Sequence, residues 1–241
     1  MNDSFKNLDY SKFKTYSCKE RVSKVNCKDF SRPWEKGGSF SIFLDKLPSI
    51  LAGNDIRYII KAISCAAKKK KQVCFAMGGH IIKTGMSPII IDLMKKNVFT
   101  LIAMNGAGII HDLETAMMGR TSEDVALSIG NGSFGMAKET SAFLNQAIKN
   151  AKTQSIGLGR AVGHMILKEN LEFKNLSLTA SGAALDIPVT VHVAIGTDII
   201  HMHPDFDAGA CGEASHYDFK WFSSNISNLE NGVFINAGSA A

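Results

Sequence analysis

The sequence lacks three features that mark specialised classes of protein. It has five cysteines among 241 residues, and no two of them have the close spacing of a zinc or redox motif. Its formal net charge is +5, without the strong clustered positive charge of a nucleic-acid-binding domain. No apolar run is long enough to cross a bilayer, and the polar N-terminus does not resemble a secretory signal. These absences predict a cytoplasmic protein with free thiols that binds neither nucleic acid nor membranes.

An ordinary globular composition accompanies these absences. Hydrophobic residues make up 45% of the chain and charged residues 20%, which is enough apolar material to bury a sizeable core. Residues 1–36 are polar and of mixed charge without a sustained period, so we expect an arm that is disordered or lies on a neighbouring surface. Residues 37–241 are expected to form a single domain.

The middle of the chain has the pattern of a parallel sheet flanked by helices. Apolar runs at 73–79 and 98–106 predict buried strands, and the segment 87–97 between them predicts a helix. Strand, helix and strand in this order form the βαβ unit, which requires parallel pairing. Further strands are expected at 187–196 and 232–241, and helices at 40–47, from a cap at Asn54 to the lysines at 68–71, at 133–152, at 158–169 and at 214–230. The sequence therefore predicts a Rossmann-like α/β fold.

Four of the predicted strands end in small or turn-forming residues: Gly78-Gly79, Asn105–Gly108, Gly196-Thr197 and Ala237–Ser239. In open parallel sheets, ligands bind at the carboxyl ends of the strands. Small residues let the backbone approach a bulky ligand, and free amides at the start of a following helix suit anions. The repetition favours a nucleotide-like ligand, although glycines also follow strands for purely geometric reasons. The segment GLGRAVG (157–163) has neither the spacing nor the preceding strand of a phosphate loop.

Two polar clusters are candidates for chemistry. His111, Asp112 and Glu114 follow the second small-residue turn, where they could transfer protons; alternatively, the two acids occupy the first turn of a helix, where negative charge is favourable. His201 and His203 would face one way in an extended chain. With Asp198, Asp205 or His192 they could bind a metal, as in a metal-dependent hydrolase, or form a polar loop that receives a cationic ligand.

Four segments taken in order resemble the deoxyhypusine synthase family, in particular its bacterial deoxyhypusine-synthase-like branch. They are GGHIIKTG (78–85), MNGAGIIHDLE (104–114), IPVTVHVAIGTD (187–198) and GVFINAGSA (232–240). The resemblance covers roughly residues 35–241. It implies a Rossmann-like fold, a homotetramer and NAD bound at subunit interfaces. It also implies transfer of the aminobutyl group of spermidine to a protein lysine through an imine.

The resemblance also implies roles for individual residues. His111 falls where the family has an acidic residue touching NAD and the amine, so it is the candidate catalytic and substrate-binding residue. His203 and Asp205 are expected to face the amine with it. The expected NAD-binding residues are Gly79, His80, Ile81, Ile82, Lys83, Asn105, Gly106, Ala107, Asp198 and Gly238.

The sequence departs from the family pattern in two places. Ile110-His111 replaces an acidic pair, and the chain stops three residues after Gly238, before the Trp-Gly-Lys stretch that carries the family's catalytic lysine. The domain is therefore expected to be shortened at its C-terminus relative to the family. Two alternatives to an NAD-dependent transferase stay open: a non-catalytic NAD- or polyamine-binding protein, and a metal-dependent hydrolase built on His201 and His203.

Overall fold

The computed structural model describes residues 9–238 and divides the chain into two compact units, residues 1–59 and 60–241. The first eight residues of the expected N-terminal arm lie outside the described residues, as does Ser239 of the last expected turn. The helix α2 (Leu51–Lys68) contributes to both units. All five cysteines are free.

The first unit is built from short helical segments. These are the 3₁₀ helices η1 (Tyr10–Lys12) and η2 (Cys27–Asp29), the helix α1 (Phe40–Lys46) and the start of α2. The expected helix at 40–47 is confirmed as α1, which Ser39 caps. The expected cap at Asn54 is wrong, because α2 begins three residues earlier. The Asn54 side chain instead donates to the Ser49 carbonyl at 2.6 Å.

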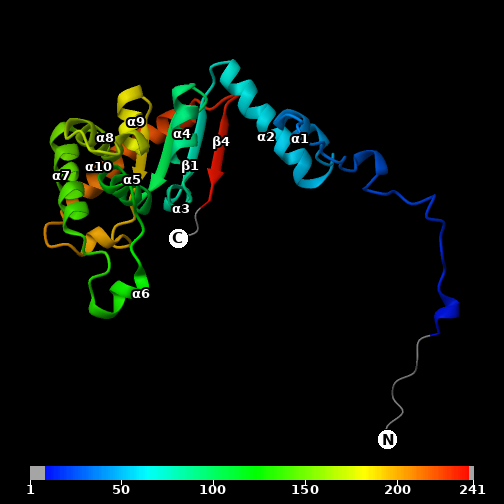
Figure 1. Ribbon diagram of the computed structural model, residues 1–241, viewed down its shortest axis with the longest axis horizontal. Helices are drawn as coiled ribbons and strands as arrows, with labels where there is room; N and C mark the ends of the chain where they lie inside the picture. Colours follow the sequence, from blue (N-terminus) through cyan, green and yellow to red (C-terminus); the bar gives the residue numbers. More distant parts are fainter. Residues whose placement is uncertain (1–8, 239–241) are drawn as a thin grey trace, which may run out of the picture. The chain divides into compact units, whose positions relative to one another are not determined.

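The second unit contains the predicted parallel sheet (Figure 1). Its described strands are β1 (Val73–Met77), β2 (Leu101–Asn105), β3 (Val189–His192) and β4 (Val233–Ala237), in the order β3-β2-β1-β4. Every pair is parallel, so all four carboxyl ends lie at one edge. The α/β fold with a parallel sheet flanked by helices is thereby confirmed.

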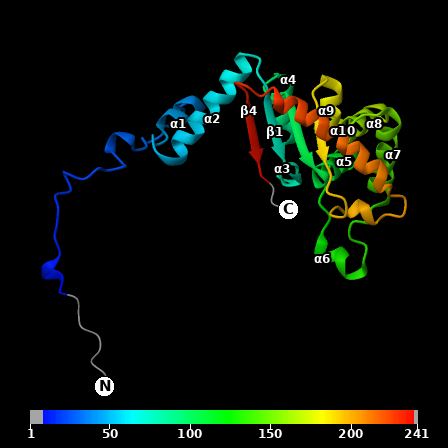
Figure 2. The ribbon, with the colours of Figure 1, turned by 180° about the vertical axis from the view of Figure 1, so that it is seen from behind.

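The helices of this unit lie on both faces of the sheet, and α10 covers one face while α4 covers the other (Figures 1 and 2). They are α3 (Gly79–Lys83), α4 (Ser87–Lys95), α5 (Gly106–Met118), α6 (Val125–Ser128), α7 (Lys138–Gln154), α8 (Leu158–Lys168), α9 (Leu178–Leu185) and α10 (Ala208–Ser227). The 3₁₀ helices are η3 (Ile129–Asn131), η4 (Lys174–Leu176) and η5 (Ile199–Met202).

In the second unit, two more helix starts differ from the sequence prediction. The helix α7 begins at Lys138 rather than at 133. The helix α10 begins at Ala208 rather than at 214, because the Asp207 side chain accepts a hydrogen bond from the Ala210 amide at 2.8 Å. The run of small residues that follows Asp207 has too weak an apolar period to indicate a helix.

The core of the second unit lies between the inner strands and their helices. Leu101 and Ile102 of β2 are fully buried, as are Leu113 of α5 and Ile148 of α7. The outer strand β4 alternates between half-buried and exposed residues, and Phe234 keeps 46% of its surface accessible. The sheet is therefore well covered at its centre and partly open along β4.

Candidate functional site

The small residues at the ends of β1 and β2 make room for polar side chains of the same chain. A Cβ atom added to Gly106, the first residue of α5, would lie less than 3.0 Å from the Asp198 carboxylate. One added to Gly79 would lie 2.7 Å from Cδ2 of His111. The loop after β3 therefore places Asp198 directly over the N-terminus of α5, where a carboxylate is favourable. The glycines admit His111 and Asp198 to the carboxyl edge of the sheet.

These two side chains line a cavity of about 250 Å³ that we call the acidic cavity. Lys83 at the end of α3 and Ala107 on α5 line it as well, so the structure brings together four of the site residues expected from the sequence. The segment between α5 and α7 forms the opposite wall. Three carboxylates reach the cavity, from Glu114, Glu123 and Asp198, against the single ammonium of Lys83. The cavity is therefore electronegative and suits a cationic ligand.

A hydroxyl connects His111 to a carboxylate in this cavity. The Thr121 hydroxyl donates to Glu114 Oε2 at 2.5 Å and lies 2.7 Å from His111 Nδ1. Since its only proton is given to Glu114, the hydroxyl must accept from His111, so Nδ1 carries the imidazole proton. The neutral ring then has its lone pair on Nε2. Glu114 and Thr121 thus fix the tautomer that a general base requires.

The burial of the site shifts the pKa values of its main groups. Burial lowers the pKa of His111 below its ordinary value; the nearby Lys83 ammonium lowers it further, while the Glu114 carboxylate opposes the shift. Burial raises the pKa of the Asp198 carboxyl. His111 is consequently neutral at physiological pH, and its Nε2 is available to accept a proton.

A second cavity of about 340 Å³ lies over the ends of β1 and β2 beside α10, and we call it the aromatic cavity. Phe219 and Phe222 of α10 line it, and the His192 ring packs edge-on against Phe222 at 5.0 Å between centroids. Asn105 lines it from the end of β2, where its side chain also accepts from the Gly108 amide at 2.9 Å. Asn105 lines the aromatic cavity and Ala107 lines the acidic cavity, so the junction of β2 and α5 contributes to both.

The remaining predicted site residues have varied positions. Ile82 is buried in the core, Ile81 packs partly against it, and His80 is exposed on α3. Gly238 follows β4, and a Cβ there would meet no atom within 4 Å. Asp205 is exposed. None of these five residues lines either cavity among the lining residues that the structure describes.

The interpretation of His201 and His203 as a pair facing one way is wrong, because the segment is the 3₁₀ helix η5 rather than extended chain. His201 Nδ1 accepts from the amides of Gly196 and Asp198 at 3.0 and 3.2 Å, which stabilises the loop. His203 Nε2 lies 3.1 Å from the Gly135 carbonyl. Over residues 9–238, no group of three His, Cys, Asp or Glu side chains could hold a metal ion.

Asp112 belongs to the core rather than to the site. It is fully buried and accepts hydrogen bonds from the Ser177 and Thr179 hydroxyls, both at 2.7 Å, and from the Leu178 and Thr179 amides. It therefore ties α5 to the N-terminus of α9. Thr121 and Glu123, by contrast, are site residues that sequence reasoning missed. They lie in a polar segment with no regular period, where nothing local distinguishes them.

The comparisons with known proteins find similarity in fold alone. An arginine dihydrolase of the cyanobacterial ornithine–ammonia cycle aligns with a TM-score of 0.50 at 14% identity, over 77% of this chain and 23% of its own. A conserved candidate LOR/SDH protein of Methanococcus maripaludis aligns at 0.47 and 14% identity, over 85% and 54% of the two chains. A candidate deoxyhypusine synthase of Entamoeba histolytica aligns at 0.45 and 12% identity, over 67% and 63%.

These alignments cover only part of the larger proteins, since the chain spans about a quarter of the dihydrolase's length. No family model and no curated protein matches the sequence. Among the described residues, no helix is both long enough and apolar enough to cross a membrane. The relationship to these proteins is thus a distant one of architecture, and the function must be argued from the site.

Proposed function

We propose that the protein is an NAD-dependent transferase of the deoxyhypusine-synthase type that acts on a small polyamine at the carboxyl edge of the sheet. The observation that carries this proposal is the acidic cavity, in which His111 stands beside three carboxylates contributed by separate segments. A protein lysine is the proposed acceptor of the aminoalkyl group, and the family resemblance supports a homotetramer.

The charge of the acidic cavity supports an amine substrate. Glu114, Glu123 and Asp198 offer three carboxylates, and spermidine carries three ammonium groups at neutral pH. Charge-assisted hydrogen bonds between such groups are stronger than neutral ones. The single cation, Lys83, is exposed at the end of α3, where its ammonium can move towards solvent when a polycation binds.

His111 is the proposed general base. Oxidation of the amine requires that a proton leave the nitrogen while a hydride leaves the adjacent carbon, so that a carbon–nitrogen double bond forms. His111 Nε2 accepts that proton, and Thr121 and Glu114 stabilise the resulting imidazolium through Nδ1. Addition of the acceptor lysine to the imine carbon and loss of the leaving amine complete the transfer.

The aromatic cavity fits one half of a dinucleotide. Its volume of about 340 Å³ is at the lower end of the range for ligand pockets, and the rings of Phe219 and Phe222 suit a flat heterocycle. NAD bound there would accept the hydride from the amine and return it to the final imine. The Asp198 carboxylate already fills the space at Gly106, which leaves no room for a phosphate at that position.

The proposal is tested by calorimetric titration of the purified chain with NAD⁺ and by following NADH formation with spermidine. We expect NAD⁺ binding and spermidine-dependent NADH formation. His111→Gln is expected to slow turnover by at least about a hundredfold without loss of NAD⁺ binding, because it removes general-base catalysis. His164→Gln, on the exposed face of α8, is the matched control and should leave turnover unchanged.

Other outcomes separate the alternatives. NAD⁺ binding without turnover of spermidine, putrescine or agmatine would support the non-catalytic cofactor-binding protein instead. A well-folded sample that binds no NAD⁺ would overturn the proposed function.

A further inference from the structure

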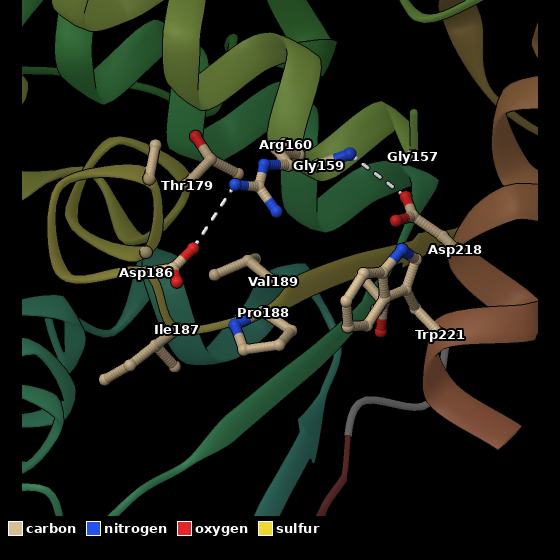
Figure 3. A pocket seen from close by; sticks show the side chains of 13 residues that line it. Gly157, Gly159, Arg160, Thr179, Asp186, Ile187, Pro188, Val189, Asp218 and Trp221 are labelled. Atoms are coloured by element: carbon tan, nitrogen blue, oxygen red, sulfur yellow. Dashed lines mark hydrogen bonds and ion pairs between the residues drawn. The ribbon is translucent and has the colours of Figure 1, made fainter. Parts of the chain in front are cut away.

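A third cavity lies away from the carboxyl edge, beside the start of β3, and has a volume of about 210 Å³ (Figure 3). Pro188 and Val189 form its floor, Arg160 reaches over it from the first turn of α8, and Trp221 extends into it from α10. Asp186, which follows α9, closes the remaining side. We call this space the β3 cavity. This volume is large enough to admit a ligand with a chain of four or five carbons.

The β3 cavity is lined by the buried carboxylate of Asp218, a residue that is 3% exposed. Its Oδ2 accepts from the Gly159 and Val191 amides at 3.0 and 2.9 Å. A Cβ on Gly157 would lie less than 3.0 Å from Oδ1, so this oxygen occupies the space that a side chain at Gly157 would need. No ion pair joins Asp218 to a cationic side chain among the described residues. Backbone amides hold this buried charge, but no counter-ion balances it.

The other charged groups of the cavity balance each other. Arg160 Nη2 lies 3.2 Å from Asp186 Oδ1, and both side chains are substantially exposed at the rim. With this pair neutral, ionised Asp218 gives the cavity a net charge of −1. Trp221 is half-exposed, and its indole lies beside the space between Arg160 and Pro188 (Figure 3). An indole face attracts cations through its quadrupole.

We propose that the β3 cavity binds a small organic cation with a primary ammonium group, whose charge is received by Asp218 and whose carbon chain lies against Trp221 and Pro188. This site is separate from the acidic cavity and does not depend on the proposed transferase activity. Lysine-like or alkylamine metabolites have the required chemistry.

Burial raises the pKa of the Asp218 carboxyl to about 7, while the amides of Gly159, Val191 and Leu158 oppose the rise. The charged groups facing it across the cavity are Arg160 of α8 and Asp186 at the end of α9. Ligand binding should therefore strengthen as the pH rises through about 7, because the cation requires the ionised carboxylate.

Fluorescence gives a direct test, because Trp34 and Trp221 are the two tryptophans of the chain. In a Trp34→Phe background all indole emission comes from Trp221. We expect n-butylammonium chloride to change this emission saturably at pH 8 and the uncharged 1-butanol not to do so. Asp218→Asn should weaken butylammonium binding by at least about tenfold, since a charge-assisted hydrogen bond is lost. His111→Gln should leave it unchanged, which separates this site from the proposed transferase function.

The Arg160→Gln variant provides a second test that does not require the Asp218→Asn protein to fold. It removes the repelling cation and frees Asp186, so butylammonium should bind more tightly than to the parent protein, whereas a ligand bound outside the β3 cavity would show no gain. Equal responses to butylammonium and 1-butanol, unchanged affinity in a folded Asp218→Asn variant, or weaker binding in Arg160→Gln would each overturn the proposal.

Discussion

Replacing Gly106 with alanine should destabilise the protein because Asp198 fills the space that a methyl group would need. The backbone of Gly106 is not among those with positive φ, and the residue opens α5. On helix propensity alone, alanine at such a position would stabilise by about 1 kcal/mol. The new Cβ, however, would lie closer than 3.0 Å to the Asp198 carboxylate, a separation that side-chain carbons do not adopt.

The sign of the effect follows from comparing these two contributions. Overpacking of a filled site costs about 1–3 kcal/mol, which exceeds or cancels the gain from helix propensity, so the variant should lose up to about 2 kcal/mol net. In an Asp198→Ala background the clash disappears, and the same substitution should then stabilise by up to about 1 kcal/mol. Gly212 of α10, where a Cβ would meet no atom within 4 Å, provides the control, and Gly212→Ala should stabilise in both backgrounds.

Urea denaturation of the four combinations of Gly106→Ala and Asp198→Ala measures these differences. The expected coupling between the two positions is about 2 kcal/mol. If Gly106→Ala stabilised the parent chain as much as Gly212→Ala does, Asp198 would not lie over the start of α5, and the description of the acidic cavity would be wrong.

Three further predictions follow from buried groups. Asp112→Asn should destabilise the fold by about 3 kcal/mol in urea denaturation because its NH2 group opposes either the Leu178 or the Thr179 amide with a second donor, whereas the exposed Asp92→Asn should change stability by less than about 0.5 kcal/mol. NMR titration should show that Glu114→Gln lowers the pKa of His111 further and that Lys83→Met raises it; a His111 pKa above 6.5 in the parent protein would contradict the described burial. The Asp218 carboxyl, with a pKa of about 7 in the fold against 3.8 in the unfolded chain, contributes stability that is present below pH 3.8 and is lost as the pH rises through 7. Asp218→Asn should flatten that part of the pH dependence of unfolding, and an unchanged slope would refute the assigned shift.

Local signals predicted the strands well, and for a physical reason. The runs around Val73–Met77 and Leu101–Asn105 are apolar because their strands are inner ones with both faces covered. Such a continuous apolar run can be recognised from the segment alone, without knowing which strands pair with it. The small residues after β2 could be recognised for the same reason, because Asn105 caps α5 from three residues away.

The roles of the other residues could not be predicted as well, because they depend on contacts between segments that are far apart in the sequence. Asp112 is a core residue because Ser177 and Thr179 meet it from 65 and 67 positions along the chain, and no local pattern separates that role from a helix-start charge. Glycine is needed at two positions of GLGRAVG because a side chain at Gly159 would meet the Val189 carbonyl and one at Gly157 would meet Asp218. Only the fold reveals these contacts. The prediction that His201 lies in extended chain is wrong because its side chain accepts hydrogen bonds from the Gly196 and Asp198 amides, and these bonds accompany the turn of the chain into η5.

The strand order has a consequence for how the protein is made. The edge of β1 that pairs with β4 has no strand to pair with until Val233–Ala237 has been synthesised, about 155 residues after β1 itself. At ordinary rates of translation this delay is roughly 10–30 s, during which the apolar residues of β1 and β2 present an unpaired strand edge. A nascent chain of this protein is therefore exposed to mispairing for most of its synthesis, and its yield should depend on chaperones and on translation speed across residues 77–233.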